Sequence, residues 1–233
     1  MEKFHFNPLP LTKKTRNFFS YLQTLFIYNA DDELFEDDDR IIARKKQIIP
    51  YHLEEEEKRQ LEEWTGKKYG EIIFDSDKDD WSQNDPFKSR VLNKSHLVFL
   101  IEDEEGQKFG GYIDAKIDKA TKQPSGWTNG SAIEDENAFV FSLKSNGRLN
   151  GMMKFGIIDK TKAFLLNDSN EEWLFLMGCN YENDIVIYKQ STKSKSYCGN
   201  YNFNYGNVKN ALRGKQRPND NFTPKRFVVI QMN

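Results

Sequence analysis

The sequence predicts a mainly antiparallel β sandwich or a related α+β fold, and three observations support this. Short apolar segments typical of strands recur along the chain from residue 71 onward. Glycine, asparagine and aspartate separate most of them, as in tight turns between strands. Few helical patterns lie between the segments, which argues against the regular strand–helix alternation of a parallel sheet. A chain of 233 residues is also long enough to bury a substantial core.

The clearest element is a predicted β-hairpin within residues 96–117, which we expect at the centre of the β core. Residues 97–101 form an apolar run that is too short for a typical helix. Residues 104–107 supply the turn, because their glycine can adopt a positive φ. The return strand contains Gly110 and Gly111. Glycine weakens a strand, so this pair predicts a bulge or another part of the chain packed closely against it.

Two helices and a series of further strands are predicted around this hairpin. Residues 53–64 form a helix that Gly66 ends, and its glutamates at 54–57 suit the positive end of the helix dipole and are expected on a solvated face. Residues 87–92 form a short helix. The other strands are expected at residues 71–74, 138–143, 154–158, 163–166, 173–177, 184–188 and 226–230.

The chain is predicted to contain an N-terminal extension, residues 1–52, and one domain, residues 53–233. Residues 15–26 carry apolar side chains at helical spacing. We interpret them as a helix packed on the main domain, with docking on a partner or membrane surface as the alternative. An acidic and then a basic segment follow, up to Pro50, and form a charged linker.

The composition excludes several classes of protein. The net charge is −2, from 34 basic and 36 acidic residues, so no overall field selects nucleic acid or an anionic membrane. Two cysteines are too few for the disulfide framework of a small secreted domain. No apolar run approaches the roughly 20 residues of a membrane-spanning helix. We therefore expect a cytoplasmic protein, with the nucleus as a second location.

No metal ligand set, cofactor motif or catalytic constellation is predicted. Residues 75–79 carry aspartates at the first, third and fifth positions of an EF-hand loop, but Asp80 and Pro86 stand where that loop needs glycine and glutamate. We interpret this segment as an acidic turn, with an atypical cation site as the alternative. The three histidines are scattered without ligand spacing, and no glycine-rich phosphate loop is present.

The order and spacing of several segments resemble one known family. The segments are residues 64, 72–76, 87, 109–113, 138–143, 154–157, 184–187 and 196–198 leading to Phe203, with a final apolar strand. Together they resemble the TLDc domain of eukaryotic oxidation-resistance proteins over residues 53–233. The segment 177–181 replaces a glycine-rich run of many members, and Gln231 and Met232 replace a terminal aromatic residue, so the chain resembles a divergent member.

This resemblance implies two antiparallel sheets packed as a sandwich with flanking helices, an α+β, mainly β fold. Several members protect cells against oxidative stress, and several bind the vacuolar-type proton ATPase. The family has no established catalytic residues to carry over. The resemblance therefore implies a non-enzymatic adaptor without a cofactor, whose partner is a protein such as a subunit of that ATPase.

Two regions are candidates for binding the partner. The polar loop at residues 123–136 contains Trp127 as an anchor. Residues 189–226, in the C-terminal third, contain nine basic residues and a single acid, Asp220, and we call these nine basic residues the basic strip. They are Lys189, Lys193, Lys195, Lys209, Arg213, Lys215, Arg217, Lys225 and Arg226. Its charge fits an acidic protein surface.

Two alternatives of other classes remain at this stage. Aromatic residues interleave with the basic strip, so it could bind RNA or single-stranded DNA by stacking and phosphate contacts. Cys198 lies near Lys193 and Lys195 in sequence, and nearby cations favour a reactive thiolate. A thiol-dependent antioxidant enzyme that uses Cys198 is therefore the enzymatic alternative.

Overall fold

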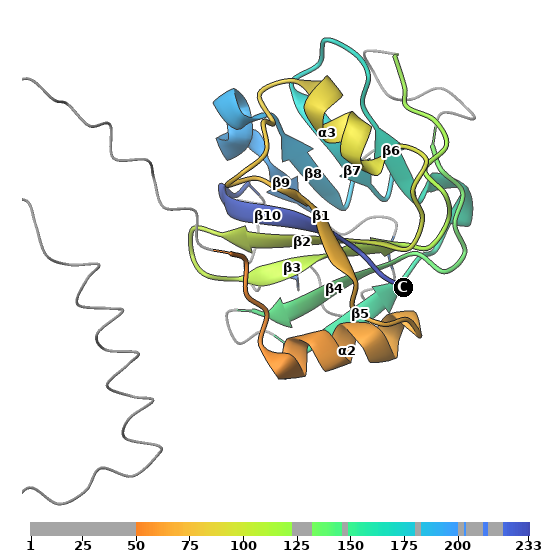
Figure 1. The fold of residues 1–233 in the computed structure, drawn as a ribbon, viewed down its shortest axis with the longest axis vertical. Helices are drawn as coiled ribbons and strands as arrows, with labels where there is room; N and C mark the ends of the chain where they lie inside the picture. The colour runs from red at the N-terminus through yellow and green to blue at the C-terminus, as the bar shows by residue number, and fades with distance from the viewer. Residues whose placement is uncertain are drawn as a thin grey trace, which may run out of the picture. The chain divides into compact units, whose positions relative to one another are not determined.

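Two antiparallel β-sheets make up most of the structure, a computed structural model in which residues 50–122, 132–145, 149–179, 183–199, 203, 212–213 and 221–233 are described. These residues belong to one compact unit that runs from Gln47 to Asn233. Helices flank the two sheets (Figure 1). The predicted α+β, mainly β sandwich is therefore confirmed.

The larger sheet has six strands in the order β1-β10-β2-β3-β4-β5. Its strands are β1 Glu71–Asp75, β2 Leu97–Asp103, β3 Lys108–Ile113, β4 Phe139–Lys144, β5 Met153–Gly156 and β10 Pro224–Gln231. All neighbouring pairs are antiparallel. The strand at the end of the chain thus lies between two strands from its first half.

The smaller sheet has four strands in the order β6-β7-β8-β9. Its strands are β6 Phe164–Leu166, β7 Trp173–Met177, β8 Ile185–Tyr188 and β9 Tyr197–Cys198. Short 3-10 helices precede β6, at η1 Lys160–Lys162, and β9, at η2 Gln190–Lys195. This sheet is a simple antiparallel meander, because each strand pairs with the next one along the chain.

Strands β2 and β3 form the predicted hairpin, and its two glycines are in close contact with other parts of the chain. The turn glycine, Gly106, has φ +76°. A Cβ atom at Gly110 would lie 1.8 Å from the carbonyl oxygen of Phe99, and one at Gly111 would lie 2.3 Å from Cε of Met177 in the smaller sheet. The expectation of closely packed neighbours is confirmed. The absence of a side chain at Gly111 lets the two sheets approach.

Aromatic side chains fill the space between the sheets. The ring of Phe99 in β2 lies 4.9 Å from both Phe164 in β6 and Phe175 in β7, measured between ring centroids. Phe87 stacks on Phe175 at 5.5 Å and contacts Phe74 edge-on at 4.9 Å. Such ring pairs stabilise a core beyond the area that they bury. Apolar side chains therefore fill the space between the two sheets, where the structure describes it.

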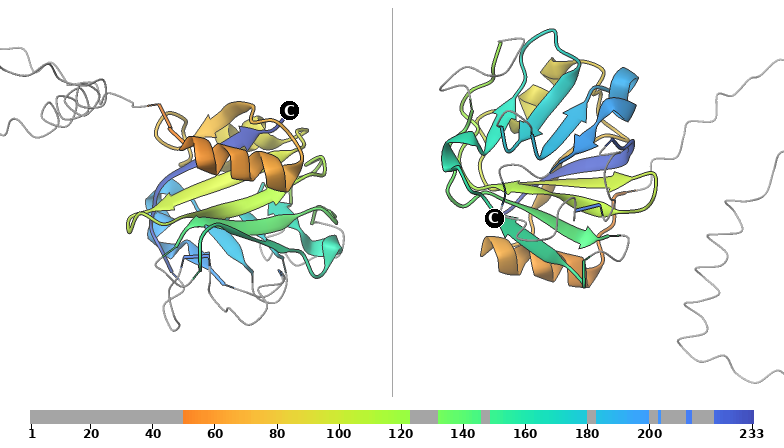
Figure 2. Two further views of the ribbon diagram at one scale, coloured as in Figure 1. Left: turned by 90° about the horizontal axis from the view of Figure 1, so that it is seen from below. Right: turned by 180° about the vertical axis from the view of Figure 1, so that it is seen from behind.

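Two helices cover different parts of the sandwich. Helix α2, Glu55–Thr65, lies across the outer face of the larger sheet (Figure 2), and Gly66 ends it with φ +67°. Helix α3, Asn84–Val91, contributes Phe87 to the core between the sheets. Both predicted helices are confirmed, with ends that differ by one to three residues.

The expectation that all four glutamates at 54–57 lie on a solvated face is wrong for Glu57. Its side chain is mostly buried, and both of its carboxylate oxygens lie 2.8 Å from Nζ of Lys108. One oxygen also accepts the backbone N–H of Glu54 at 3.1 Å and so caps the helix. Periodicity could not reveal this role, because Lys108 reaches the helix from strand β3.

Candidate functional site

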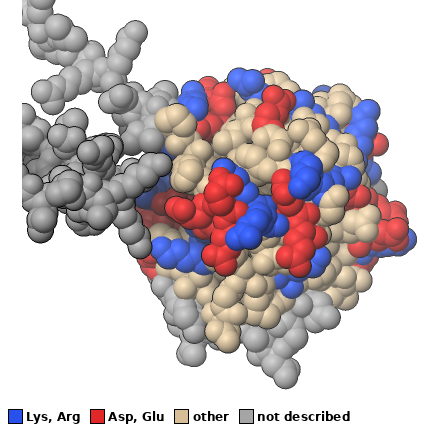
Figure 3. All heavy atoms as spheres, turned by 60° about the horizontal axis from the view of Figure 1, so that its bottom comes forward, with Lys and Arg blue, Asp and Glu red and all other residues tan. Residues whose placement is uncertain are grey.

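A groove lies where the C-terminal end of α2 meets the outer face of β3, β4 and β5. It has a volume of about 320 Å³. Its lining residues are Trp64, Thr65, Lys67, Tyr112, Asp114, Asn137, Phe139 and Lys154. We call it the Trp64 groove. Acidic and basic side chains are mixed on the face of the molecule that carries α2, as Figure 3 shows.

Three aromatic side chains form one wall of the Trp64 groove. The ring of Phe139 lies 5.1 Å from Tyr112 on the neighbouring strand and 6.3 Å from Trp64 at the end of the helix. The ammonium group of Lys154 lies 5.2 Å from the centre of the Phe139 ring and donates to the carbonyl oxygen of Trp64 at 3.2 Å. A cation placed there is stabilised by the ring face and by the negative end of the helix dipole.

The carboxylate of Asp114 lies at the centre of a hydrogen-bond network at the edge of this groove. Oδ1 accepts from the Tyr112 hydroxyl at 2.5 Å and lies 2.8 Å from Nδ1 of His96. Oδ2 accepts from the Asn137 side chain at 3.2 Å. His96 has a positive φ of 59°, so its backbone conformation is one that few residues other than glycine adopt. The network therefore fixes the segments that enter β2 and leave β3.

The protonation of the network follows from these contacts. Burial acts to raise the pKa of Asp114, but the hydrogen bonds from Tyr112 and His96 outweigh it and hold that pKa below its usual range. Burial, together with the hydrogen bond to Asp114, raises the pKa of Tyr112. At neutral pH Asp114 is thus an ionised acceptor and Tyr112 a neutral donor. The pair orders the groove wall, and neither group exchanges a proton near neutrality.

A second groove, of about 330 Å³, continues from the first and shares Asp114 and Asn137 with it. We call it the Glu134 groove, and its other lining residues are Ala115, Glu134, Asp135, Glu136 and Lys160. The buried Asp135 carboxylate accepts the backbone N–H groups of Asp114, Ala115 and Asn137 at 2.6, 3.0 and 2.9 Å. Asp135 therefore fixes the backbone of three residues of the Glu134 groove, two of which also line the Trp64 groove.

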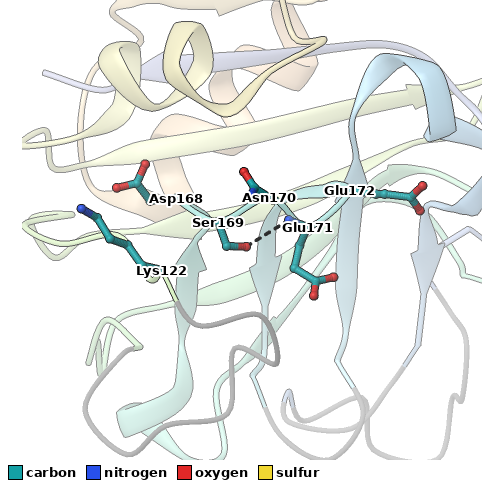
Figure 4. Close-up of a pocket in the computed structure, with 6 residues that line it drawn as sticks. All are labelled: Lys122, Asp168, Ser169, Asn170, Glu171 and Glu172. Carbon is teal, nitrogen blue, oxygen red and sulfur yellow. Dashed lines mark hydrogen bonds between the residues drawn. The ribbon is translucent and has the colours of Figure 1, made fainter.

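A third groove, of about 540 Å³, lies beside the turn between β6 and β7 (Figure 4). It is lined by Lys122 and by residues 168–172. Its carboxylates do not converge: Asp168 forms an ion pair with Lys88, Glu172 forms one with Lys195, and Glu171 points away from both. Across the described residues, no group of three or more His, Cys, Asp or Glu side chains is arranged to hold a metal ion.

Both cysteines are buried and neither forms a disulfide. Cys198 is only 3% exposed, in the edge strand of the smaller sheet. Burial raises the pKa of the Cys179 thiol, and the nearby Asp184 carboxylate raises it further. The cations near Cys198 in sequence make other contacts, because Lys195 pairs with Glu172 and Lys193 donates to the carbonyl oxygen of Pro224 at 3.3 Å.

The described members of the basic strip differ in their burial and in the groups that they bind. Arg213 is 4% exposed, and its guanidinium donates to Asp103 at 2.8 Å and to the carbonyl oxygen of Asn221 at 3.0 Å. It also lies over the ring of Phe222, at 4.9 Å. Arg213 thus links Asp103 at the end of β2 to Asn221, and its charge is buried. Lys209, Lys215, Arg217 and the loop residue Trp127 lie outside the described residues.

The remaining members of the basic strip are also engaged within the chain. Arg226 binds both oxygens of Asp75, at 2.9 and 2.6 Å, which pins the predicted acidic turn to β10. Lys225 pairs with Glu102 at 2.8 Å. Lys189 is buried. Acids that are remote in sequence therefore neutralise much of the strip, which sequence proximity alone could not show.

Sequence reasoning missed the Asp114 network, although the hairpin contained a signal for it. Leu97 pairs with Ile113, so the next pair along the same register is His96 and Asp114. Strand alternation then places the side chains of Tyr112 and Asp114 on the same side of β3. Asn137 lies in the turn that precedes β4, and its position could not be derived from the hairpin.

Two comparisons with known proteins bear on the identity of the chain. A sequence model of the TLDc domain matches residues 43–223, which is more than half of the chain and includes most of both sheets. No curated protein matches the chain. No helix in the described ranges is long and apolar enough to cross a membrane. The chain belongs to the TLDc domain family.

Proposed function

We propose that this chain is a non-enzymatic interaction module of the TLDc type that acts by binding a protein partner. The observation that carries this proposal is the Trp64 groove, in which aromatic and charged side chains line a shallow surface above a filled core. Trp64 is partly exposed between Lys67 and Lys154, while Tyr112 and Phe139 are buried beneath it. A partly exposed aromatic residue with adjacent charges is typical of surfaces that recognise proteins. The protonation of Tyr112 and Asp114 described above suits a fixed binding wall.

We propose that the partner is a protein that takes part in the resistance of cells to oxidative stress, or a subunit of the vacuolar-type proton ATPase. Membership of the TLDc family supports this choice, because several members of the family protect against oxidative stress and several bind that ATPase. The module then acts in the cytoplasm or in the nucleus. Trp127, Lys193, Lys195, Lys209, Lys215 and Arg217 stay candidates for this contact, whereas Arg213 supports the interior.

We also propose that residues 1–52 form an extension and that residues 53–233 form the interaction module. The match to the TLDc domain starts at residue 43 and the compact unit starts at Gln47, and both lie within ten residues of this boundary. The extension is a candidate for a second contact with the partner. Limited proteolysis that leaves a stable fragment starting near residue 50 is the expected result.

Affinity capture from the native cell, followed by binding of the purified partner, tests the proposed function. The tagged full chain is expected to retain a specific protein, and the two purified proteins are expected to bind directly. A chain that retains no protein above a tagged, unrelated control contradicts the proposal. Purified subunits of the proton ATPase provide a second, direct arm, which tests the choice of partner separately.

The thiol-dependent alternative receives less support, because Cys198 is buried and the cations near it in sequence make other contacts. Peroxide turnover by the purified full chain, compared with Cys198→Ser, tests it. A turnover that the substitution abolishes would favour the enzyme over the adaptor. The nucleic-acid alternative predicts binding that weakens steeply with added salt, and the internal pairing of Arg213, Lys225 and Arg226 weakens its basis.

A further inference from the structure

We propose that the Trp64 groove, together with Ile158, receives a segment of the protein partner in which a carboxylate side chain lies next to a bulky apolar side chain. This inference rests on the proposed function and names the surface and the chemistry of the contact. The charge of the groove and the exposure of Ile158 support it independently.

Two lysines at the groove provide the charge. Within the described residues Lys154 pairs with no carboxylate, and its ammonium contacts only the Trp64 carbonyl and the Phe139 ring. Lys67 approaches Asp114 only to 3.9 Å, at the limit of an ion pair. The Asp114 carboxylate already accepts hydrogen bonds from Tyr112 and Asn137 and lies 2.8 Å from Nδ1 of His96. Both ammonium groups can therefore donate hydrogen bonds to a carboxylate of the partner.

The neighbouring grooves lack this excess of positive charge. In the Glu134 groove, the single lysine, Lys160, lies 3.4 Å from Glu134 and 3.8 Å from Glu136. In the groove of Figure 4, Asp168 and Glu172 already bind lysines from other elements. An incoming carboxylate would meet repulsion from acids in both places. Charge complementarity thus favours the Trp64 groove.

The apolar half of the contact lies at the end of β5. Ile158 is 66% exposed and Met153 is 37% exposed, and they are the two large apolar side chains that stand exposed among the described residues. The backbone N–H of Ile157 donates to the carbonyl oxygen of Ala138 at 3.2 Å. Ile158 therefore lies next to Asn137, which lines the groove. An apolar side chain can cover Ile158 while its neighbour reaches the lysines.

Nuclear magnetic resonance of the ¹⁵N-labelled full chain tests the inference with two short probes. The first peptide is acetyl-Gly-Glu-Phe-Gly-amide, and the second replaces its glutamate by lysine. We expect the first peptide to shift the indole resonance of Trp64 and the amides of Lys154 and Ile158, with a dissociation constant of about 1 mM. We expect binding of the lysine peptide to be at least about tenfold weaker.

Three variants complete the experiment. Lys154→Glu is expected to weaken the glutamate peptide about tenfold, because it exchanges an attraction for a repulsion. Lys154→Met removes the charge while it keeps the apolar stem, and an intermediate loss is expected. Lys122→Glu makes the same charge change in the groove of Figure 4 and is expected to leave binding unchanged.

Several results would overturn the inference. These are equal or tighter binding of the lysine peptide, shifts that map to other grooves, saturation that is unaffected by Lys154→Glu, and no shift by either peptide. Binding of the captured partner to the Lys154→Glu variant distinguishes a failure of this inference from a failure of the proposed function. A partner that binds Lys154→Glu as tightly as wild type refutes this groove but leaves the adaptor function intact, whereas a chain that binds no protein refutes both.

Discussion

The basic strip and the Trp64 groove use their cationic side chains in opposite ways. In the strip, Arg213 and Arg226 are largely buried and bind the carboxylates of Asp103 and Asp75. In the groove, Lys154 lies at the surface and contacts a ring and a carbonyl group. The strip is conspicuous in sequence and the groove is not. Charges that cluster in sequence can therefore serve the interior, and a charged surface can assemble from residues that are far apart in the chain.

The largest expected effect is the loss of stability in Arg213→Met. This change leaves the Asp103 carboxylate, whose side chain is 1% exposed, without its cation. Removing one partner of a buried ion pair costs about 3–5 kcal/mol in the free energy of unfolding. Urea denaturation of the full chain measures it. A loss below about 1 kcal/mol would show that the ion pair of Arg213 contributes no more than an exposed one, which would contradict the contrast between the basic strip and the Trp64 groove.

Arg226→Met is expected to lower the free energy of unfolding by roughly 1.5–3 kcal/mol at neutral pH, because it removes two charged hydrogen bonds to Asp75. Burial acts to raise the pKa of Asp75, but the Arg226 guanidinium outweighs it and lowers that pKa. A carboxyl with a lowered pKa stabilises the fold above its unfolded pKa, and this contribution is lost as the pH falls through the folded pKa.

The difference between wild type and Arg226→Met should therefore shrink as the pH falls from about 5 toward 2. Denaturation at several pH values provides the measurement. A difference that stays constant over this range would show that Arg226 acts through packing on Tyr51, over whose ring it lies at 5.1 Å, and that the pair with Asp75 contributes little.

Lys195→Met is expected to change the free energy of unfolding by only about 0–1 kcal/mol. Lys195 and Glu172 are both about half exposed, so water and salt screen their attraction. The effect should decrease further with added salt. A large effect that persists at high salt would contradict the distinction between the buried and the exposed members of the strip.

The smallest effect on stability is expected for Lys154→Met, which removes the charge without placing a carboxylate at the negative end of helix α2, and we expect it within about 0.5 kcal/mol of wild type. The side chain is exposed and makes no ion pair within the described residues. Thermal unfolding and peptide binding, measured on the same sample, sharpen the comparison. Loss of binding with an unchanged unfolding temperature identifies a surface residue, whereas a fall in both would indicate that Lys154 mainly caps helix α2.

Much of the fold could be predicted from the sequence, because its signals are local. The apolar run at residues 97–101, the turn glycine at 106 and Gly66 after α2 each have a local physical meaning, and the structure confirms each of them. Gly110 and Gly111 also predicted close packing, although their contacts with Phe99 and Met177 could not be named in advance. The pairing of β10 between β1 and β2 required the structure, since the partners lie more than 100 residues apart.

The candidate site was much less predictable. Lys193, Lys195 and Arg213 were selected because they lie close together in sequence, yet one contacts a backbone carbonyl, one pairs with Glu172 and one is buried against Asp103. The residues of the Trp64 groove come from a helix, the end of a hairpin and two further strands. Local sequence patterns carry no direct information about contacts between elements that are far apart in the chain.

The amino-acid sequence was sufficient to predict a mainly antiparallel β sandwich with a glycine-marked central hairpin, because strand patterns and turn residues are properties of neighbouring residues, and the order of its segments resembled the TLDc family. Which charges are paired in the interior and which remain at the surface became evident only from the folded chain. An ion pair depends on the distance between two side chains and on their burial, and both are set by packing between segments that are remote in the chain.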